Sequence, residues 1–169
     1  MSHHYSSMIE QKHTWFWLYQ AIGLAQGAGL HHKIQNASQS KVKLWKRIWW
    51  ACLIRDRLVA LGTGRPTHIR NADCSTAMID MTDLEEDGDT DEQQSVKATF
   101  IDFARLCWIM EDVITAVVSP KLPYLNEACT SALSDWHRSL AQPARVQNKA
   151  DGTNRIKALY HIVIQMIYK

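Results

Sequence analysis

The segment that most constrains the fold is LWKRIWWACLIRDRLVALGTGRP, residues 44–66. With a period of 3.6 residues, its apolar side chains fall on most sides of a helix that we place at about 42–61. Gly62 and Gly64 end this helix, and Pro66 prevents the chain from continuing it. A helix that is apolar on most sides must be covered by other elements. The segment therefore predicts the central helix of a bundle.

The charged side chains of this helix decide between a core and a nucleic-acid surface. A helix that reads nucleic acid gathers its basic residues on one exposed face. Here a helical wheel scatters them, because Lys46 and Arg57 form a narrow stripe that we expect to be solvated, whereas Arg55 and Asp56 fall among apolar residues. An unpaired buried charge is strongly destabilising, so we expect Arg55 and Asp56 to be paired, with each other, with neighbouring helices or with the acidic segment described below. The apolar arcs that we expect to be buried hold Leu44, Trp45, Ile48, Trp49, Ala51, Cys52 and Val59.

Helical spacing recurs along the rest of the chain, and no segment shows the alternation typical of a strand. We therefore predict an all-α fold, an irregular multi-helix bundle that forms a single domain over residues 1–169. The core helices are expected at about 9–30, 42–61, 96–118, 124–140 and 155–168, with a long acidic loop at about 67–95. The chain ends at Lys169 within an apolar segment, which suggests a fragment of a longer protein.

Charge is distributed unevenly, although the formal net charge is only +2. Residues 41–70 contain eight basic residues and one acid, and residues 80–92 contain eight acids and no base. The small net charge gives no reason to assign nucleic-acid or membrane binding to the whole chain. A simple explanation is that the basic and acidic segments face each other across the fold.

The sequence offers no convincing metal-binding pattern. The cysteines at positions 52, 74, 107 and 129 are too widely spaced for the closely paired ligands of a structural zinc site. Residues 83–94 begin like a calcium loop, but the twelfth position holds Gln94 where a bidentate glutamate belongs. We therefore predict a solvated acidic loop and no metal site.

No catalytic constellation or membrane segment is evident either. Asp135, His137 and Ser139 are close in sequence, but neighbours in one helix point in different directions and cannot align as a triad. No glycine-rich phosphate loop follows a strand. No stretch approaches the 18 or more apolar residues of a transmembrane helix. We expect no enzyme activity, no catalytic or cofactor-binding residues, and no membrane partner.

Two blocks of the sequence resemble a known family. WFWLYQAIGLAQGAGLHH (residues 15–32) and LWKRIWWACLIRDRLVALGTGRPTHI (residues 44–69) are similar to the middle homology region of fungal zinc binuclear cluster transcription factors, of the cutinase transcription factor type. LSDWHRSL and ALYHIVIQMIY resemble later helices of that region. The family motif positions are Lys46, Arg47, Trp49, Trp50, Asp56, Arg57, Gly64, Arg65 and Pro66.

The resemblance implies a nuclear regulatory domain that controls DNA-templated transcription. Family members carry an N-terminal six-cysteine zinc cluster that reads DNA, and no cysteine spacing here fits it. We therefore expect DNA contact only through that missing cluster, and no zinc or other cofactor in this chain. The partners that this resemblance leaves open are protein co-regulators, a small-molecule effector and a second copy of the chain in a homodimer. The alternative is a free-standing helical interaction module that modulates full-length relatives.

Overall fold

The computed structural model describes residues 8–118 and 127–140. Within these ranges the chain forms five α-helices and one 3-10 turn, and it contains no strand, which confirms the predicted all-α fold. The elements are α1 (Met8–Gly27), α2 (Gln39–Thr63), η1 (Asn71–Asp73), α3 (Met81–Leu84), α4 (Asp91–Val118) and α5 (Glu127–Leu140).

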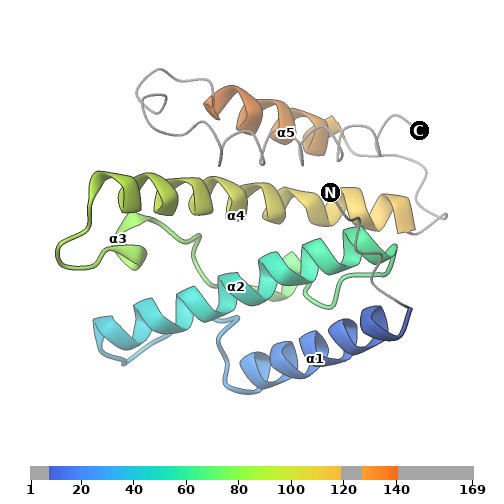
Figure 1. The fold of residues 1–169 in the computed structure, drawn as a ribbon, viewed down its shortest axis with the longest axis horizontal. Coiled ribbons are helices and arrows are strands. Elements are labelled where there is room, and N and C mark those ends of the chain that lie inside the picture. Colours follow the sequence, from blue (N-terminus) through green and yellow to red (C-terminus); the bar gives the residue numbers. More distant parts are fainter. Residues whose placement is uncertain (1–7, 119–126, 141–169) are drawn as a thin grey trace.

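Helix α2 lies between α1 and α4, and α5 covers the opposite side of α4 (Figure 1). The short α3 contacts α2 and α4 near the start of both helices. This order gives α2 and α4 three helical neighbours each, two long helices and the short α3, whereas α1 is packed mainly against α2. None of the helices within the described ranges is both long and apolar enough to span a membrane.

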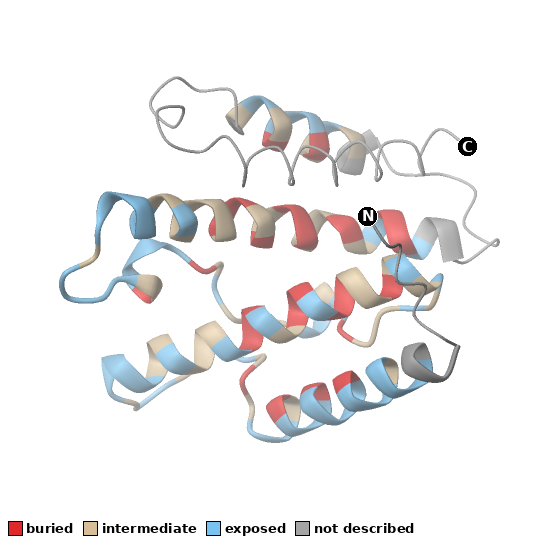
Figure 2. Cartoon of the chain, viewed as in Figure 1, coloured by how far each residue is buried: buried red, intermediate tan, exposed pale blue. Residues whose placement is uncertain are grey.

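The hydrophobic core follows the contacts of the two central helices (Figure 2). Trp49, Trp50 and Leu53 of α2 are almost fully buried, as is Met110 of α4. Further buried apolar residues come from α1, α4 and α5 and from the segment between α2 and α4: Leu18, Ile22, Ile69, Ile79, Leu106, Val113, Ile114, Leu133 and Trp136. The tryptophans of residues 44–66 thus contribute to the core, as the sequence predicts.

The observed helix ends differ from the predicted ones by a few residues. Helix α1 ends at Gly27, and the chain turns at Gly29, which adopts a φ of 75° that favours glycine. Helix α2 begins at Gln39 and ends before Gly64, whose φ is 64° and whose N–H caps the carbonyl of Ala60. The helix predicted at 155–168 and residues 124–126 lie outside the described residues.

The long acidic loop predicted at 67–95 is not confirmed, because ordered elements divide it. Asp80 caps the short helix α3, and its side chain accepts a hydrogen bond from the backbone N–H of Thr82 at 2.9 Å. Helix α4 begins at Asp91, ahead of the predicted start at 96, because Thr90 and Gln93 bond reciprocally at its start. The N–H of Thr90 donates to Gln93 Oε1 at 2.8 Å, and the N–H of Gln93 donates to Thr90 Oγ1 at 3.3 Å. Such a capping box lets a polar sequence begin a helix.

The orientation predicted for α2 is wrong for Lys46, Arg57 and Arg55, whereas Asp56 is buried and paired as predicted. Arg57, predicted to be solvated, has a fully buried side chain, and the Lys46 side chain is 11% exposed. Arg55, predicted to be buried and paired, is exposed, and so are Leu44, Ile48 and Ala51. The reason is that α3 and α4 supply carboxylates to the Lys46 and Arg57 side, which the wheel of one helix cannot reveal.

Candidate functional site

The charged motif residues of α2 belong to two polar clusters that lie on the side facing α3 and α4. We call the group formed by Asp56, Arg57, His68, Asn71 and Glu111 the buried cluster. We call the group formed by Lys46, Arg47, Asp80, Asp83 and Glu86 the acidic-edge cluster. The two clusters lie about two to three helical turns apart along α2.

Asp56 is the acceptor at the centre of the buried cluster. Its side chain is 1% exposed and accepts hydrogen bonds from the backbone N–H groups of His68 at 3.0 Å and Ile69 at 2.9 Å. His68 Nδ1 lies 2.9 Å from Asp56 Oδ1, and Arg57 NH1 donates to Oδ2 at 2.9 Å. A carboxylate can remain charged in a protein interior when several donors replace its lost hydration. Asp56 therefore fixes residues 68–69 against α2.

Arg57 links three segments through one planar guanidinium group. Besides Asp56, its NH1 donates to the carbonyl of Ile69 at 2.8 Å. Its NH2 donates to Asn71 Oδ1 at 2.9 Å and to Glu111 Oε2 at 3.3 Å. The fixed fork of donors in arginine suits such a junction, and lysine could not reproduce it.

Glu111 and Asn71 extend the junction into α4. The backbone N–H of Asn71 donates to Glu111 Oε2 at 2.6 Å, and the Asn71 side chain donates to the carbonyl of Trp108 at 2.8 Å. Asn71 is also the first residue of η1, so its contacts hold the start of that turn on α4. Together with Arg57, these bonds tie α2, residues 68–71 and α4 into one unit.

The Gly-Arg-Pro stop returns the chain to the buried cluster. Gly64 ends α2 in the left-handed conformation, and the N–H of Arg65 donates to the carbonyl of Ala60 at 3.2 Å. Pro66 lacks an N–H and cannot continue the helix. The reversal brings His68 alongside Asp56 only twelve residues after it in the sequence.

Aromatic contacts connect the same reversal to α1. The Trp15 ring lies 4.4 Å from the His68 ring, measured between centroids, and the Arg65 guanidinium lies 5.3 Å from the Trp15 centroid. Tyr19 lies 5.4 Å from His68. Cation–aromatic and ring contacts of this kind each add a modest stabilisation. Through His68, the buried cluster is thus in contact with α1 as well as with α2 and α4.

In the acidic-edge cluster the basic and acidic segments meet, in the way the charge distribution suggests. Lys46 Nζ lies 2.5 Å from Asp83 Oδ2 and 3.5 Å from Asp80 Oδ2. Arg47 donates to the backbone carbonyl of Asp83, and its NH1 lies 3.2 Å from Glu86 Oε1. The hydrogen bond from the Thr82 hydroxyl, followed by the nearby Lys46 charge, lowers the pKa of Asp80 below its usual value. This cluster is more exposed than the buried cluster, since the Glu86 side chain is 67% exposed.

The motif tryptophans are packing residues with little exposed surface. Trp50 donates from Nε1 to the carbonyl of Ala77 at 3.0 Å, and its ring lies 5.7 Å from the Trp108 ring. The Trp49 ring lies 5.7 Å from the His31 ring. Burial, followed by the neighbouring His32 charge, lowers the pKa of His31, so a neutral imidazole is favoured beside Trp49.

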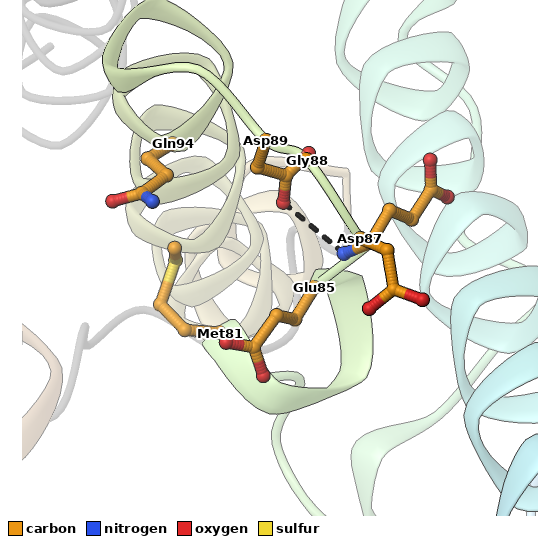
Figure 3. A pocket seen from close by; sticks show the side chains of 7 residues that line it. Met81, Glu85, Asp87, Gly88, Asp89 and Gln94 are labelled. Atoms are coloured by element: carbon orange, nitrogen blue, oxygen red, sulfur yellow. Dashed lines mark hydrogen bonds between the residues drawn. The ribbon is translucent and has the colours of Figure 1, made fainter.

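A hollow lined by Met81, Glu85, Glu86, Asp87, Gly88, Asp89 and Gln94 lies where the calcium-like sequence is found (Figure 3). Asp83 and Asp89 already have cationic partners, Lys46 and Lys97 at 2.5 and 2.6 Å. Figure 3 shows the carboxylates spread around the hollow. No group of side chains in the described part of the chain is arranged to hold a metal ion.

Two cysteines and two residues of the Asp135, His137 and Ser139 group have surroundings that do not favour nucleophilic chemistry. Burial raises the pKa of the Cys107 thiol to about 12 and that of Cys74 to about 11, which disfavours the reactive thiolate. Ser139 donates back to the carbonyl of Trp136 at 2.7 Å, and Asp135 pairs with Arg138 at 2.9 Å. Ser139 and Asp135 are thus bonded to groups other than His137.

His68, Asn71 and Glu111 are the cluster residues that sequence reasoning missed. Two of them lie within five residues after the Gly-Arg-Pro stop, and Glu111 is a carboxylate within a largely apolar helical run. A charged residue in such a run signals a partner, because unpaired burial is unfavourable. The identity of the partner depends on tertiary packing across 54 residues, which no local pattern reveals.

A family described as "Fungal specific transcription factor domain" matches residues 1–141, which contain both clusters. Among curated proteins, the chain is 42% identical over 101 residues to cutinase transcription factor 1 beta of Fusarium vanettenii. That alignment covers 59% of this chain and 12% of the relative.

Two further relatives extend the similarity. Cutinase transcription factor 1 alpha of Fusarium vanettenii is 36% identical over 115 residues, which cover 62% of this chain and 12% of the relative. A transcription factor of Fusarium pseudograminearum (strain CS3096) is 27% identical over 218 aligned residues, which cover 99% of this chain and 24% of the relative. No solved structure matches.

Proposed function

The chain belongs to the fungal specific transcription factor domain family, and we propose that it serves a longer nuclear regulator as a non-catalytic region whose helical packing tunes transcription. The observation that carries this proposal is the buried cluster, which lies on motif residues within the matched range. Its charged groups bond to one another and to backbone atoms, so they support a role in holding helices together.

The proposal assigns DNA recognition to another part of the regulator. The cysteines of this chain lack zinc-cluster spacing, and the chain spans only 12% of the length of the two cutinase relatives. Basic residues that would be available for phosphate contacts are partly used inside the molecule: Lys46, Arg47 and Arg57 all pair with carboxylates. In the same proposal, zinc is held only by the separate DNA-binding cluster, and a small-molecule effector or protein co-regulators bind to this domain.

A reporter assay tests the regulatory role. The 169-residue chain is fused to an unrelated DNA-binding domain and expressed in fungal cells that carry a reporter gene. We expect the fusion to change reporter output relative to the DNA-binding domain alone, and Arg57→Met to abolish that change because it breaks the junction of α2 and α4. Arg138→Met, at an exposed position of α5, is the matched control.

The outcome is read at equal protein levels, measured by immunoblot of nuclear extracts. Reporter output equal to that of the DNA-binding domain alone would contradict the regulatory role. For the nuclear assignment, the chain is fused to a DNA-binding domain that has no nuclear import signal. Exclusion of this fusion from the nucleus would contradict the assignment.

A further inference from the structure

Helices α1 and α2 expose large apolar side chains on one side of their contact. On α1, Trp17 is 68% exposed and Leu24 is 76% exposed, and their seven-residue spacing places them on one stripe. On α2, Leu44 and Ile48 are 53% and 41% exposed, and Ala51 continues the same stripe. Exposed apolar side chains that gather in this way mark binding surfaces.

A groove joins the two stripes. It lies between α1 and α2 and has a volume of about 560 Å³. Trp17 and Ala21 of α1 line one side, and Arg55 of α2 lines the other. His13, Thr14 and Leu18 complete the lining. Because Arg55 continues the stripe of Ile48 and Ala51 by helical spacing, the groove and both stripes form one surface, which we call the α1–α2 face.

The charge of the α1–α2 face is positive. Lys41 and Arg55 stand at the two ends of the α2 stripe, both exposed, with Leu44, Ile48 and Ala51 between them. Between residues 12 and 70 the sequence contains one carboxylate, Asp56, and that carboxylate is buried and bonded to its own cluster. Outside this stretch α1 contains one further carboxylate, Glu10, and Arg55 forms no ion pair within the described residues.

We infer that the α1–α2 face binds an amphipathic helix that carries acidic residues at the ends of an apolar stripe. The apolar stripe of that helix would lie over Trp17, Ala21 and Ile48, and its carboxylates would pair with Lys41 and Arg55. Fourteen residues of α helix span about 21 Å, so acids roughly four turns apart match the two cations. Helix-in-groove binding of this kind takes its affinity from the apolar anchors and its selectivity from the charges.

This inference goes beyond the proposed regulatory function, because it assigns a partner chemistry to the exposed side of α2, which faces away from the buried cluster. It is also tested with the purified chain, so a failed reporter assay and a failed binding assay remain distinguishable.

The test uses a synthetic, fluorescein-labelled helical peptide with leucines at spacings of three and four residues and glutamates at both ends. Binding to the full 169-residue chain is measured by fluorescence anisotropy. A second peptide, with every glutamate replaced by lysine, keeps the apolar stripe and reverses the charge. We expect the acidic peptide to bind at least about tenfold more tightly than the basic one, and its affinity to fall as salt rises.

Two variants locate the binding site. Arg55→Glu reverses the charge at an exposed position and should weaken the acidic peptide about tenfold while improving binding of the basic peptide. Trp17→Ala removes the largest exposed anchor and should weaken both peptides. Arg138→Glu, which makes the same charge change at an exposed site on α5, should leave both affinities unchanged.

Equal affinity for the two peptides, or equal effects of Arg55→Glu and Arg138→Glu, would overturn the inference. A second copy is the competing occupant, and sedimentation identifies it. A concentration-dependent dimer that Trp17→Ala dissociates, in a protein that does not bind the acidic peptide, would assign the face to self-association and overturn the inference as well.

Discussion

The two charged clusters of α2 use the same kinds of residue in different surroundings. In the buried cluster the Arg57 and Asp56 side chains are 0% and 1% exposed, and backbone groups supply much of the bonding. In the acidic-edge cluster Arg47 and Glu86 are 32% and 67% exposed. Water can replace a lost partner at the exposed Arg47–Glu86 pair of the acidic-edge cluster, but not at the buried cluster or at Asp83, whose side chain is 7% exposed. Ion pairs from one helix therefore differ in how much the fold depends on them.

The largest contrast is expected for the loss of Arg57. Arg57→Met removes a guanidinium that bonds to Asp56, Ile69, Asn71 and Glu111. We expect the free energy of unfolding to fall by about 3–5 kcal/mol, the range seen when one partner of a buried ion pair is removed. Urea unfolding followed by tryptophan fluorescence measures it, with Arg138→Met as the exposed control. Equal urea midpoints for Arg57→Met and Arg138→Met would contradict the expectation that the buried arginine stabilises the fold more than the exposed one.

An intermediate effect is expected at the edge of the buried cluster. Glu111→Gln keeps the shape of the side chain and an acceptor oxygen, but it removes the charge that faces Arg57 and the N–H of Asn71. We expect a loss of about 1.5–3 kcal/mol, typical of hydrogen bonds to charged groups. Hydrogen exchange of residues near η1 should rise at the same time. Unchanged exchange at Asn71 would show that Glu111 does not hold this segment.

A smaller loss is expected at the acidic edge. Arg47→Met removes the partly exposed pair with Glu86 and the bond to the carbonyl of Asp83, for a loss of about 1 kcal/mol or less. High salt should narrow the difference between this variant and wild type, because salt screens exposed pairs more than buried ones. A difference that salt leaves unchanged would mean that Arg47 acts through packing.

The smallest effect concerns pH. The Thr82 hydroxyl, with Lys46 nearby, lowers the folded-state pKa of Asp80. A lowered pKa favours the folded state above the ordinary aspartate value, near 3.9, and this contribution is lost as pH falls through the lowered value. Asp80→Asn should therefore differ from wild type in melting temperature at pH 7, and the difference should shrink below about pH 4. A difference that persists at low pH would rule out this linkage.

The sequence was sufficient for the helical class, for the stop at Gly64 and for the burial of Trp49 and Trp50, because periodicity and backbone chemistry are local. It also indicated that Asp56 needs a partner. Which side of α2 faces the core could not be predicted. Its own apolar side chains point in most directions, so a helical wheel identifies no single buried face. Leu44 and Ile48 look like core residues by type, yet they are exposed because no described element covers that side.

The start of α4 and the partners of Arg57 illustrate two further limits. Thr90 and Gln93 form a capping box within the acidic segment. The first turn of α4 has no apolar stripe, so helical periodicity alone placed the start of the helix too late. Glu111 reaches Arg57 only because α2 and α4 pack together, and that distance in sequence is beyond any local rule. The sequence therefore indicates which charged residues need a partner, but only the folded structure shows which residues pair.

The most direct test compares Asp56→Ala with Glu86→Ala in urea unfolding. Both substitutions remove one carboxylate that pairs with an arginine of α2. We predict that Asp56→Ala lowers the free energy of unfolding by about 3–5 kcal/mol and that Glu86→Ala lowers it by no more than about 1 kcal/mol. Equal losses, or an Asp56→Ala protein as stable as wild type, would contradict the claim that the buried cluster holds α2, residues 68–71 and α4 together.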